Sequence, residues 1–402
     1  MVGIVLKRLA TAPMYHLGRL RRRDPRVWVF GNGRGFRDSP RYLVRHVAAE
    51  HPDLKAYWIA RTDAEAEEAA AAGVRVAIRG TSEARSLQRR AGAAFLCIGI
   101  NDLESVQLGG SHLVMLYHGT ALKRVLLDAE LHRLSGATPL ARLAQRLYRW
   151  SLRRTYAQVD LFVAAGELAR SRYLSSFGCQ PSAVQILGNP RFDVITTGVE
   201  LEGVPEDLRQ RLGIAPDERL VLWVPTWREH GDEGWLPPLD AGLVRAALDG
   251  TKVRLVVKPH PHSDQSVIDE RLPAHPAVQV LREGEIDINL LLHEADALVT
   301  DYSSAVYDYA IRERPILFFA PDVDDYDQQG RGLYEPYASL TGGSFHRTWA
   351  SLLEAVVESV TGGADSEGHA TVRHIRAMAR NSEAPGSSER IVQAIRGALE
   401  IS

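Results

Sequence analysis

The sequence predicts an α/β protein made of two doubly wound domains whose parallel sheets face a central cleft. Short apolar runs rich in β-branched residues alternate with longer helical patterns, which is typical of parallel strands joined by helices. The alternation restarts near residue 219, and a length of 402 residues suits two domains of ordinary size.

The first half of the chain holds a series of expected strands separated by helices. A glycine-rich turn, "GNGRGFRD", follows the first strand, and helices are expected at 39–51, 65–73 and 137–158, the last of them long and amphipathic. The strands are expected at 26–31, 55–60, 74–78, 93–99, 112–119, 161–166 and 183–188.

The second half repeats this organisation. Helices are expected at 239–249, 287–295 and 304–313, and a final helix at 389–399. The strands are expected at 219–227, 252–260, 278–282, 297–301 and 315–320. We therefore divide the chain into a basic N-terminal segment, a Rossmann-like domain, a linker, a second Rossmann-like domain and a C-terminal helix. Their bounds are 1–26, 27–193, 194–216, 217–380 and 381–402.

The composition excludes several classes of protein. A net charge of -2 does not favour nucleic acid as a partner. Two cysteines cannot form a disulfide framework or a thiolate zinc site, so a reducing compartment fits. No apolar run is long enough for a transmembrane helix, and the first residues make no convincing signal peptide.

Residues 1–26 are basic and amphipathic. Their charged side chains are Lys7, Arg8, Arg19, Arg21, Arg22, Arg23 and Arg26, against Asp24 alone, with apolar residues between them. Such a segment can lie on anionic lipid headgroups. It can equally be a solvated helix on the surface of the first domain, and the pattern leaves both open.

Polar clusters follow five of the expected strands, and a sixth follows the last strand after an acidic loop. Because ligands bind beyond the carboxyl ends of parallel strands, clusters in both domains indicate one site in the cleft. Their candidate residues are His118, Gly119, Thr120 and Lys123; Arg191 in "GNPRFD"; Arg228 in "PTWRE"; Lys258 and His260 in "KPHPH"; Thr300, Asp301, Ser303 and Ser304 in "TDYSS"; and Arg331 in "RGLYEP".

The "TDYSS" cluster lies between a strand and an expected helix. Helix N-termini offer unpaired N–H groups to phosphate, and Ser303 and Ser304 add hydroxyl donors. Simple capping of the helix is the alternative. With Arg228, Lys258 and Arg331 in the same domain, phosphate binding is favoured, and these cations could neutralise a diphosphate without a metal.

His260 stands between two prolines, which fix the direction of its imidazole. The spacing of His260, His262 and Asp264 matches no zinc motif, so no metal ligand is assigned. The acidic "PDVDDYD" stretch is read as a solvated loop, although it leaves divalent cation binding open.

His118 is the candidate general base, since a neutral imidazole can accept a hydroxyl proton near physiological pH. Gly119 permits close approach of the backbone, and Lys123 could support negative charge on a substrate. A packed turn histidine remains the alternative. The turn "GNGRGFRD" lacks the spacing of a dinucleotide fingerprint, and neither a P-loop nor a nucleophile elbow occurs.

Together the motifs resemble the CDP-glycerol glycerophosphotransferase family, the teichoic acid primases and polymerases, over about residues 27–340. "YHGTALKRV" is similar to the family's H-G-T-P-x-K element, and "GNPRFD", "PTWRE", "KPHPH", "TDYSSAVYDYA" and "RGLYEP" follow in the family's order. Ala121 stands where proline is usual and Tyr117 where tryptophan is common, which loosens any assignment of subfamily or acceptor.

The resemblance implies a GT-B-type fold with an acceptor-side first domain and a second domain that binds the CDP donor. It implies transfer of an alditol phosphate from CDP-glycerol or another CDP-alditol to a hydroxyl of a lipid-linked saccharide or polymer, with release of CMP. It places His118 as the base near the acceptor. His260, Ser303, Ser304 and Arg331 would contact the donor phosphates, Arg228 and Lys258 would line that pocket, and Thr300 and Asp301 would organise the helix start.

The resemblance also implies a cytoplasmic protein held on the inner face of the membrane. No cofactor is required, and a divalent cation is left open. Little sequence lies outside the two domains, so we expect a minimal catalytic unit. Two other functions remain: a sugar transferase of the same fold that uses a nucleotide sugar, and a non-catalytic protein that binds wall polymer or lipid headgroups.

Overall fold

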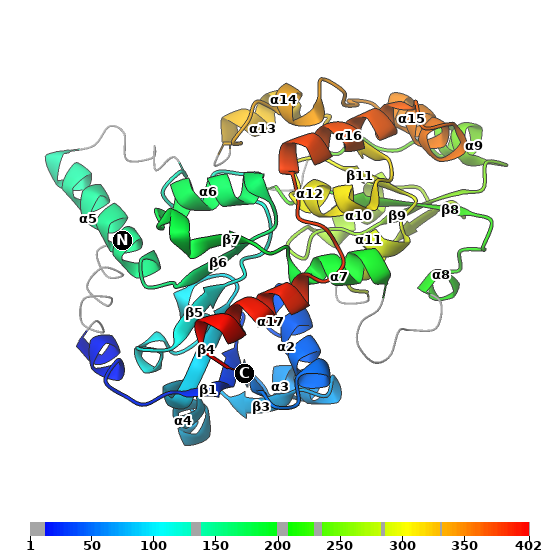
Figure 1. The fold of residues 1–402 in the computed structure, drawn as a ribbon. Coiled ribbons are helices and arrows are strands. Elements are labelled where there is room, and N and C mark those ends of the chain that lie inside the picture. Colours follow the sequence, from blue (N-terminus) through cyan, green and yellow to red (C-terminus); the bar gives the residue numbers. More distant parts are fainter. Residues whose placement is uncertain are drawn as a thin grey trace.

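The computed structural model describes residues 13–129, 138–198, 208–228, 235–282, 286–329 and 332–401. These residues form two parallel sheets, each with helices packed on both of its faces (Figure 1). The predicted α/β class with two doubly wound domains is confirmed.

The described part of the first domain contains a seven-stranded sheet in the order β3-β2-β1-β4-β5-β6-β7. The strand order reverses between β1 and β4, which creates the crevice where doubly wound folds bind ligands. The strands are β1 Asp24–Phe30, β2 Lys55–Ala60, β3 Arg75–Ile78, β4 Ala91–Leu96, β5 His112–Met115, β6 Leu161–Ala164 and β7 Val184–Ile186.

The described part of the second domain repeats the pattern with a five-stranded sheet in the order β10-β9-β8-β11-β12. Here the strand order reverses between β8 and β11, and the pairs are again parallel. The strands are β8 Arg219–Val224, β9 Val253–Val257, β10 Val278–Val280, β11 Ala297–Thr300 and β12 Ile316–Phe318.

Helices connect the strands and close both domains. Those of the first half are α2 Asp38–Glu50, α3 Asp63–Ala71, α4 Ser82–Arg90, α5 Pro139–Tyr156, α6 Glu167–Phe177 and α7 Pro190–Thr197. Those of the second half are α8 Leu208–Arg211, α9 Ala241–Leu248, α10 Gln265–Arg271, α11 Ile288–Glu294, α12 Ala305–Tyr309, α13 Val323–Gln329, α14 Tyr337–Thr341, α15 Trp349–Thr361, α16 Glu367–Ala379 and α17 Ser387–Ala398.

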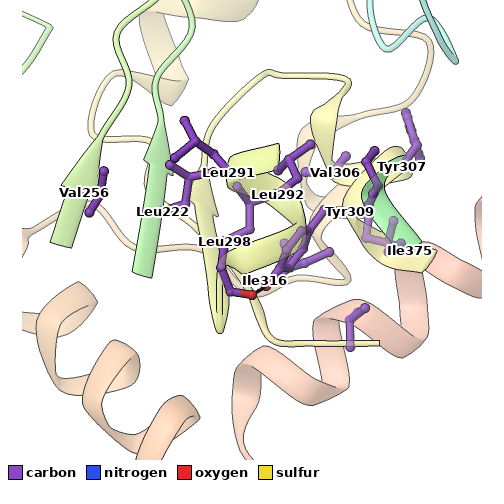
Figure 2. Close-up of a cluster of buried hydrophobic side chains, with 14 of the residues drawn as sticks. Leu222, Val256, Leu291, Leu292, Leu298, Val306, Tyr307, Tyr309, Ile316 and Ile375 are labelled. Atoms are coloured by element: carbon purple, nitrogen blue, oxygen red, sulfur yellow. Dashed lines mark hydrogen bonds between the residues drawn. The ribbon is translucent and has the colours of Figure 1, made fainter. Parts of the chain in front are cut away.

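Both sheets are apolar on both faces, as sheets covered by crossover helices must be. In β1, Val27 and Val29 pack toward α4, α5 and α6, whereas Trp28 and Phe30 pack toward α2, α3 and α17. In the second domain one cluster gathers Leu222, Leu298 and Ile316 under α11, α12 and α16 (Figure 2). The same cluster includes Tyr42 and Ile195 of the first half, so the apolar core continues across the joint between the domains.

The C-terminal helix α17 returns to the first domain and packs against α2 and α7 (Figure 1). Its start is held by Asp193, whose carboxylate accepts hydrogen bonds from the backbone N–H groups of Gly386, Ser387 and Ser388 at 2.7–2.8 Å. The last residue of "GNPRFD" therefore caps a helix nearly 200 positions further along the chain.

Several expected bounds differ from the structure: β8 and β9, for example, end at Val224 and Val257 rather than at 227 and 260. Strand β5 ends at Met115 rather than at 119, because Tyr117 and Gly119 take positive φ angles of 51° and 113° that turn the chain. Helix α7 continues to Thr197, past the expected domain boundary at 193. The acidic stretch expected as a solvated loop starts helix α13 and supplies Asp322 to an ion pair with Arg228.

Residues 1–12 of the basic segment lie outside the described residues. Residues 13–18 are helical, and Tyr15 is buried while Met14, Leu17 and Leu20 are exposed. Within the described ranges, no helix has the length and hydropathy to cross a bilayer.

Candidate active site

The carboxyl edge of the second sheet is organised around Arg228. Its guanidinium lies 2.8 Å from a carboxylate oxygen of Asp301, after β11, and 2.8 Å from one of Asp322, after β12. Burial alone would lower the pKa of Arg228, but Asp301 and Asp322 more than offset it and raise this pKa above its usual value. We call Arg228 with these two carboxylates the C-terminal bridge.

Asp301 also accepts hydrogen bonds from the backbone N–H groups of Thr226 at 2.9 Å and Tyr302 at 2.6 Å. Thr300 is buried, and its hydroxyl donates to the carbonyl of Val224 at 2.7 Å. These residues join the ends of β8 and β11. The geometry thus favours a framework role for Thr300, Asp301 and Arg228.

An aromatic stack lies beside the C-terminal bridge. The rings of Tyr302 and Tyr326 stack with centroids 3.5 Å apart, and the Arg228 guanidinium lies 5.0 Å from each centroid. From the first domain, Lys123 places its Nζ 5.1 Å from the Tyr326 centroid. The predicted acceptor-side lysine therefore reaches the same ring stack as the predicted donor-side arginine.

The remaining polar groups of the second domain lie at the same edge. His260 is exposed and stacks on Trp227 with centroids 6.3 Å apart, which brings "KPHPH" beside "PTWRE". Its Nδ1 accepts a hydrogen bond from the N–H of His262 at 3.1 Å, so a neutral His260 carries its proton on Nε2. Lys258 is partly buried next to them, and its N–H donates to the carbonyl of Trp223 at 2.9 Å.

Ser303 and Ser304 are partly buried at the start of α12. The Ser303 hydroxyl accepts a hydrogen bond from the N–H of Ala305 at 3.2 Å, and Ser304 is the N-cap residue without a capping hydrogen bond from its side chain. Both hydroxyls keep the capacity to donate to an anion.

His118 lies past the end of β5, where the first domain meets the second. Its ring is partly buried, and Nδ1 is enclosed without a hydrogen-bond partner. Burial lowers the pKa of His118 to about 4, against the opposing effect of the Asp38 carboxylate. The imidazole is therefore neutral at physiological pH and able to accept a proton.

Arg191 connects His118 to the second domain. Its guanidinium donates to the carbonyl of His118 at 3.0 Å, lies 3.2 Å from a carboxylate oxygen of Asp38 in α2, and lies 2.9 Å from one of Asp308 in α12. Burial raises the pKa of Asp308 to about 6, although Arg191 acts to lower it. We call Arg191 with Asp38 and Asp308 the interdomain bridge.

Gly119 is required for this arrangement. Its φ of 113° is strained for other residues, and a Cβ atom there would meet the Arg191 guanidinium at 2.0 Å. Thr120 is buried, with its hydroxyl oxygen lacking a hydrogen-bond partner. The glycine in this motif thus makes room for an arginine of the protein.

A second connection joins the domains beyond Lys123. Residues 122–124 pair with 332–334: Lys123 forms an antiparallel bridge with Leu333, the N–H of Arg124 donates to Gly332 at 3.0 Å, and the N–H of Tyr334 donates to Leu122 at 3.2 Å. Arg331 itself lies outside the described residues, as does Glu229 of "PTWRE".

Comparison with known proteins decides the family. The family model described as CDP-glycerol:poly(glycerophosphate) glycerophosphotransferase matches residues 13–397. The chain belongs to this family.

The chain aligns with only part of the length of two curated relatives. A teichoic acid poly(glycerol phosphate) polymerase of Staphylococcus epidermidis is 24% identical over 320 residues, which cover 78% of this chain and 43% of that protein. A teichoic acid glycerol-phosphate transferase of Staphylococcus aureus is 26% identical over 246 residues, which cover 60% of each.

Solved structures support the fold. The wall teichoic acid polymerase TagF superposes with a TM-score of 0.72 and 21% identity, covering 99% of this chain and 95% of that one. A putative UDP-N-acetylglucosamine 2-epimerase from Listeria monocytogenes has a TM-score of 0.53 and 14% identity, covering 94% and 98%. These neighbours fit a two-domain GT-B architecture, as predicted.

Sequence reasoning missed the residues that hold the site together. Asp38, Asp308 and Asp322 complete the two arginine bridges, and Arg172 joins the Tyr307 hydroxyl at 3.3 Å to Glu335 at 2.6 Å. Asp308 lies four residues after Ser304, inside the recognised family motif "TDYSSAVYDYA", and Asp322 lies in the acidic stretch "PDVDDYD". Asp38 is the last residue of the turn "GNGRGFRD", whose pattern did not indicate an ion pair, and Arg172 stands in ordinary helical sequence.

Proposed function

We propose that this chain transfers glycerol phosphate, or a related alditol phosphate, from a CDP-linked donor to a hydroxyl of a lipid-linked acceptor in teichoic acid synthesis, and releases CMP. Family membership supports the reaction class. The observation that carries the proposal is the contact path from His118 through Arg191 to Asp308. This path ties the backbone of His118, whose imidazole is neutral, to the helix that follows Ser304 in the other domain.

In the proposed reaction the acceptor hydroxyl attacks the β-phosphorus of the donor. His118 takes the hydroxyl proton on Nε2, since Nδ1 is the enclosed nitrogen. The new P–O bond forms to the acceptor oxygen, the bond to the bridging oxygen breaks, and CMP leaves with that oxygen. Positioning and electrostatics supply the catalysis, as in other phosphoryl transfers.

The donor phosphates are proposed to bind the hydroxyl, imidazole and ammonium donors of Ser303, Ser304, His260 and Lys258 at the carboxyl edge of the second sheet. Arg331, which lies outside the described residues, is proposed from the sequence motif alone. Arg228 and Arg191 act behind them, because each guanidinium is enclosed by two carboxylates of the protein. We expect that the reaction requires no metal ion. The test is to compare turnover with and without EDTA.

The direct test incubates the full chain with CDP-glycerol or CDP-ribitol and a synthetic lipid-linked disaccharide. CMP release and product masses are measured. We expect His118→Gln to lose at least about 100-fold in kcat, as removal of a general base does. The matched control is His112→Gln, since His112 lies at the opposite end of β5 and should not affect turnover.

The same assay separates the alternatives. Turnover of a UDP-hexose without turnover of either CDP-alditol would establish the sugar transferase. Tight polymer binding without any CMP release would establish the binding protein. Full activity of His118→Gln with normal folding would remove the base assignment.

We further propose that the chain lies on the inner face of the cell membrane through α5 and the segment 13–20. Among the described residues, the exposed large apolar side chains all lie on these two segments: Met14, Leu17, Leu20, Leu143, Leu147 and Trp150. Helix α5 carries five arginines and no acidic residue. The segment 13–20 lies near the end of α5, because Tyr15 and Arg19 line one surface hollow with Gln158 and Asp160, which follow that helix.

Vesicle sedimentation tests this surface. We expect Arg146→Glu to weaken binding to anionic vesicles several-fold at low salt, since each basic residue near such a surface contributes on the order of 1 kcal/mol. Arg245→Glu makes the same charge change on the exposed side of α9 and should bind like the unmodified chain. Equal losses in both variants would show a non-specific charge effect and contradict the proposed surface.

A further inference from the structure

We propose that His46, His51 and Glu389 form a binding site for a zinc-class divalent ion that fastens the C-terminal helix α17 to the first domain. Among the described residues, this is the group of three His, Cys, Asp or Glu side chains that could hold a metal ion. It lies away from the cleft, and neither the proposed reaction nor any motif of the sequence uses it.

The three ligand atoms converge from two elements that are far apart in the sequence. His46 lies in α2, His51 is the residue that ends α2, and Glu389 lies in the first turn of α17. The Nε2 atoms lie 3.1 Å and 2.9 Å from the same carboxylate oxygen of Glu389, and all three ligand atoms are within 4.8 Å of one another.

This geometry is close to that of a metal site. Ligands about 2.0–2.2 Å from a tetrahedral ion are about 3.3–3.6 Å apart, so small shifts of the side chains would admit zinc. In either tautomer the Nε2 atoms point at Glu389, and with Nδ1 protonated their lone pairs face the common point. Two imidazoles and a carboxylate suit zinc, cobalt and nickel better than magnesium or calcium.

The surroundings support a site with an open position. The imidazoles of His46 and His51 are 20% and 12% exposed and the Glu389 side chain is 43% exposed, so solvent can supply a further ligand. Gln393, one turn along α17, donates to the other oxygen of Glu389 at 2.6 Å and orients the carboxylate.

The position of the site defines its role. Asp193 already holds the start of α17, and Ile391, Val392 and Ile395 bury its apolar face against the first domain. An ion shared by α2 and α17 adds a bond that the unfolded chain lacks, and its binding free energy therefore stabilises the docked helix.

The experiment uses the full chain freed of metal with a chelator and then given Zn²⁺ or Co²⁺. We expect one equivalent of zinc per chain after dialysis, a rise in Tm on zinc addition, and slower hydrogen exchange of the α17 amides. His51→Gln and Glu389→Gln should lose all three effects. Circular dichroism establishes that each variant is folded, and the visible spectrum of added Co²⁺ reports the site without relying on stability.

Two controls separate this site from other histidines. His275→Gln removes an imidazole that lies 3.4 Å from a carboxylate oxygen of Asp249. This variant should still bind zinc at His46, His51 and Glu389. His262→Gln breaks the exposed His260–His262 pair and should also retain it. Absence of zinc, zinc retained by both His51→Gln and Glu389→Gln, or loss of zinc in His262→Gln would each overturn the proposal.

Discussion

The two arginine bridges have the same composition, but one connects the two domains and the other connects strand ends within the second domain. In each, a buried guanidinium lies between two carboxylates and also donates to a backbone carbonyl: Arg191 to that of His118, and Arg228 to that of Thr226. The interdomain bridge takes its carboxylates from α2 and α12, one in each domain. The C-terminal bridge takes both from the carboxyl edge of one sheet.

Because of this difference, we expect the guanidinium groups of Arg191 and Arg228 to have separate roles. Arg228 joins strand ends at the edge of the second sheet where we propose that the donor binds, whereas Arg191 connects the backbone of His118 to α12. Loss of Arg228 should therefore change donor binding, and loss of Arg191 should change turnover.

The largest effect is expected for Arg228→Met. The Asp301 side chain is 1% exposed, so removal of Arg228 leaves a buried, unpaired carboxylate. We expect a loss of about 3–5 kcal/mol in the free energy of unfolding and weaker CDP binding. Denaturant unfolding measures the free energy of unfolding, and titration calorimetry measures CDP binding. Lys252→Met is the control, because its pair with Asp217 is exposed and its removal should change little.

A slightly smaller effect is expected for Arg191→Met, at about 3 kcal/mol, because Asp38 is 24% exposed and can be hydrated. CDP should bind this variant nearly as tightly as the unmodified chain, while kcat falls. A variant that loses CDP affinity and keeps its kcat would reverse the roles assigned to the two bridges.

The pH dependence of stability tests the environment of His118. With its pKa lowered to about 4, the unfolded chain binds a proton between about pH 6.5 and 4 that the folded chain does not. The free energy of unfolding therefore falls as the pH falls through this window. Asp308 acts in the opposite direction, because burial raises its pKa to about 6.

Comparison with His118→Gln isolates the histidine, since the variant retains Asp308. Between about pH 7 and about pH 4.5 the unmodified chain should lose about 2–3 kcal/mol more than the variant, by urea unfolding. Parallel curves for the two chains would show that the imidazole is hydrated rather than enclosed.

The sequence was sufficient for the architecture because hydrophobic runs and turn residues are local signals. Each strand expected from 26–31 to 315–320 occurs in the structure, and β2 occurs with the expected bounds. The family motifs also led to the polar edges of both sheets. Residues such as Thr226, Asp301 and His260 do lie together there.

Pairings between distant side chains could not be read in the same way. The motifs named Arg191 and Arg228 as candidate site residues but did not indicate the carboxylates beside them. The carboxylates that enclose them come from other elements, and Asp38 itself adopts a φ of 61°, which no local pattern reveals. The premature end of β5 has the same origin, since Tyr117 turns the chain in response to its packing on Tyr173 and Phe177.

The return of α17 to the first domain has a consequence for biosynthesis. Trp28, Phe95 and Leu43 belong to the apolar cluster that Ile391, Val392 and Ile395 complete. During translation the ribosome must therefore pass Ala398 before the first domain can cover this surface. The domain made first is finished last, and until then its exposed apolar face is one that chaperones would recognise.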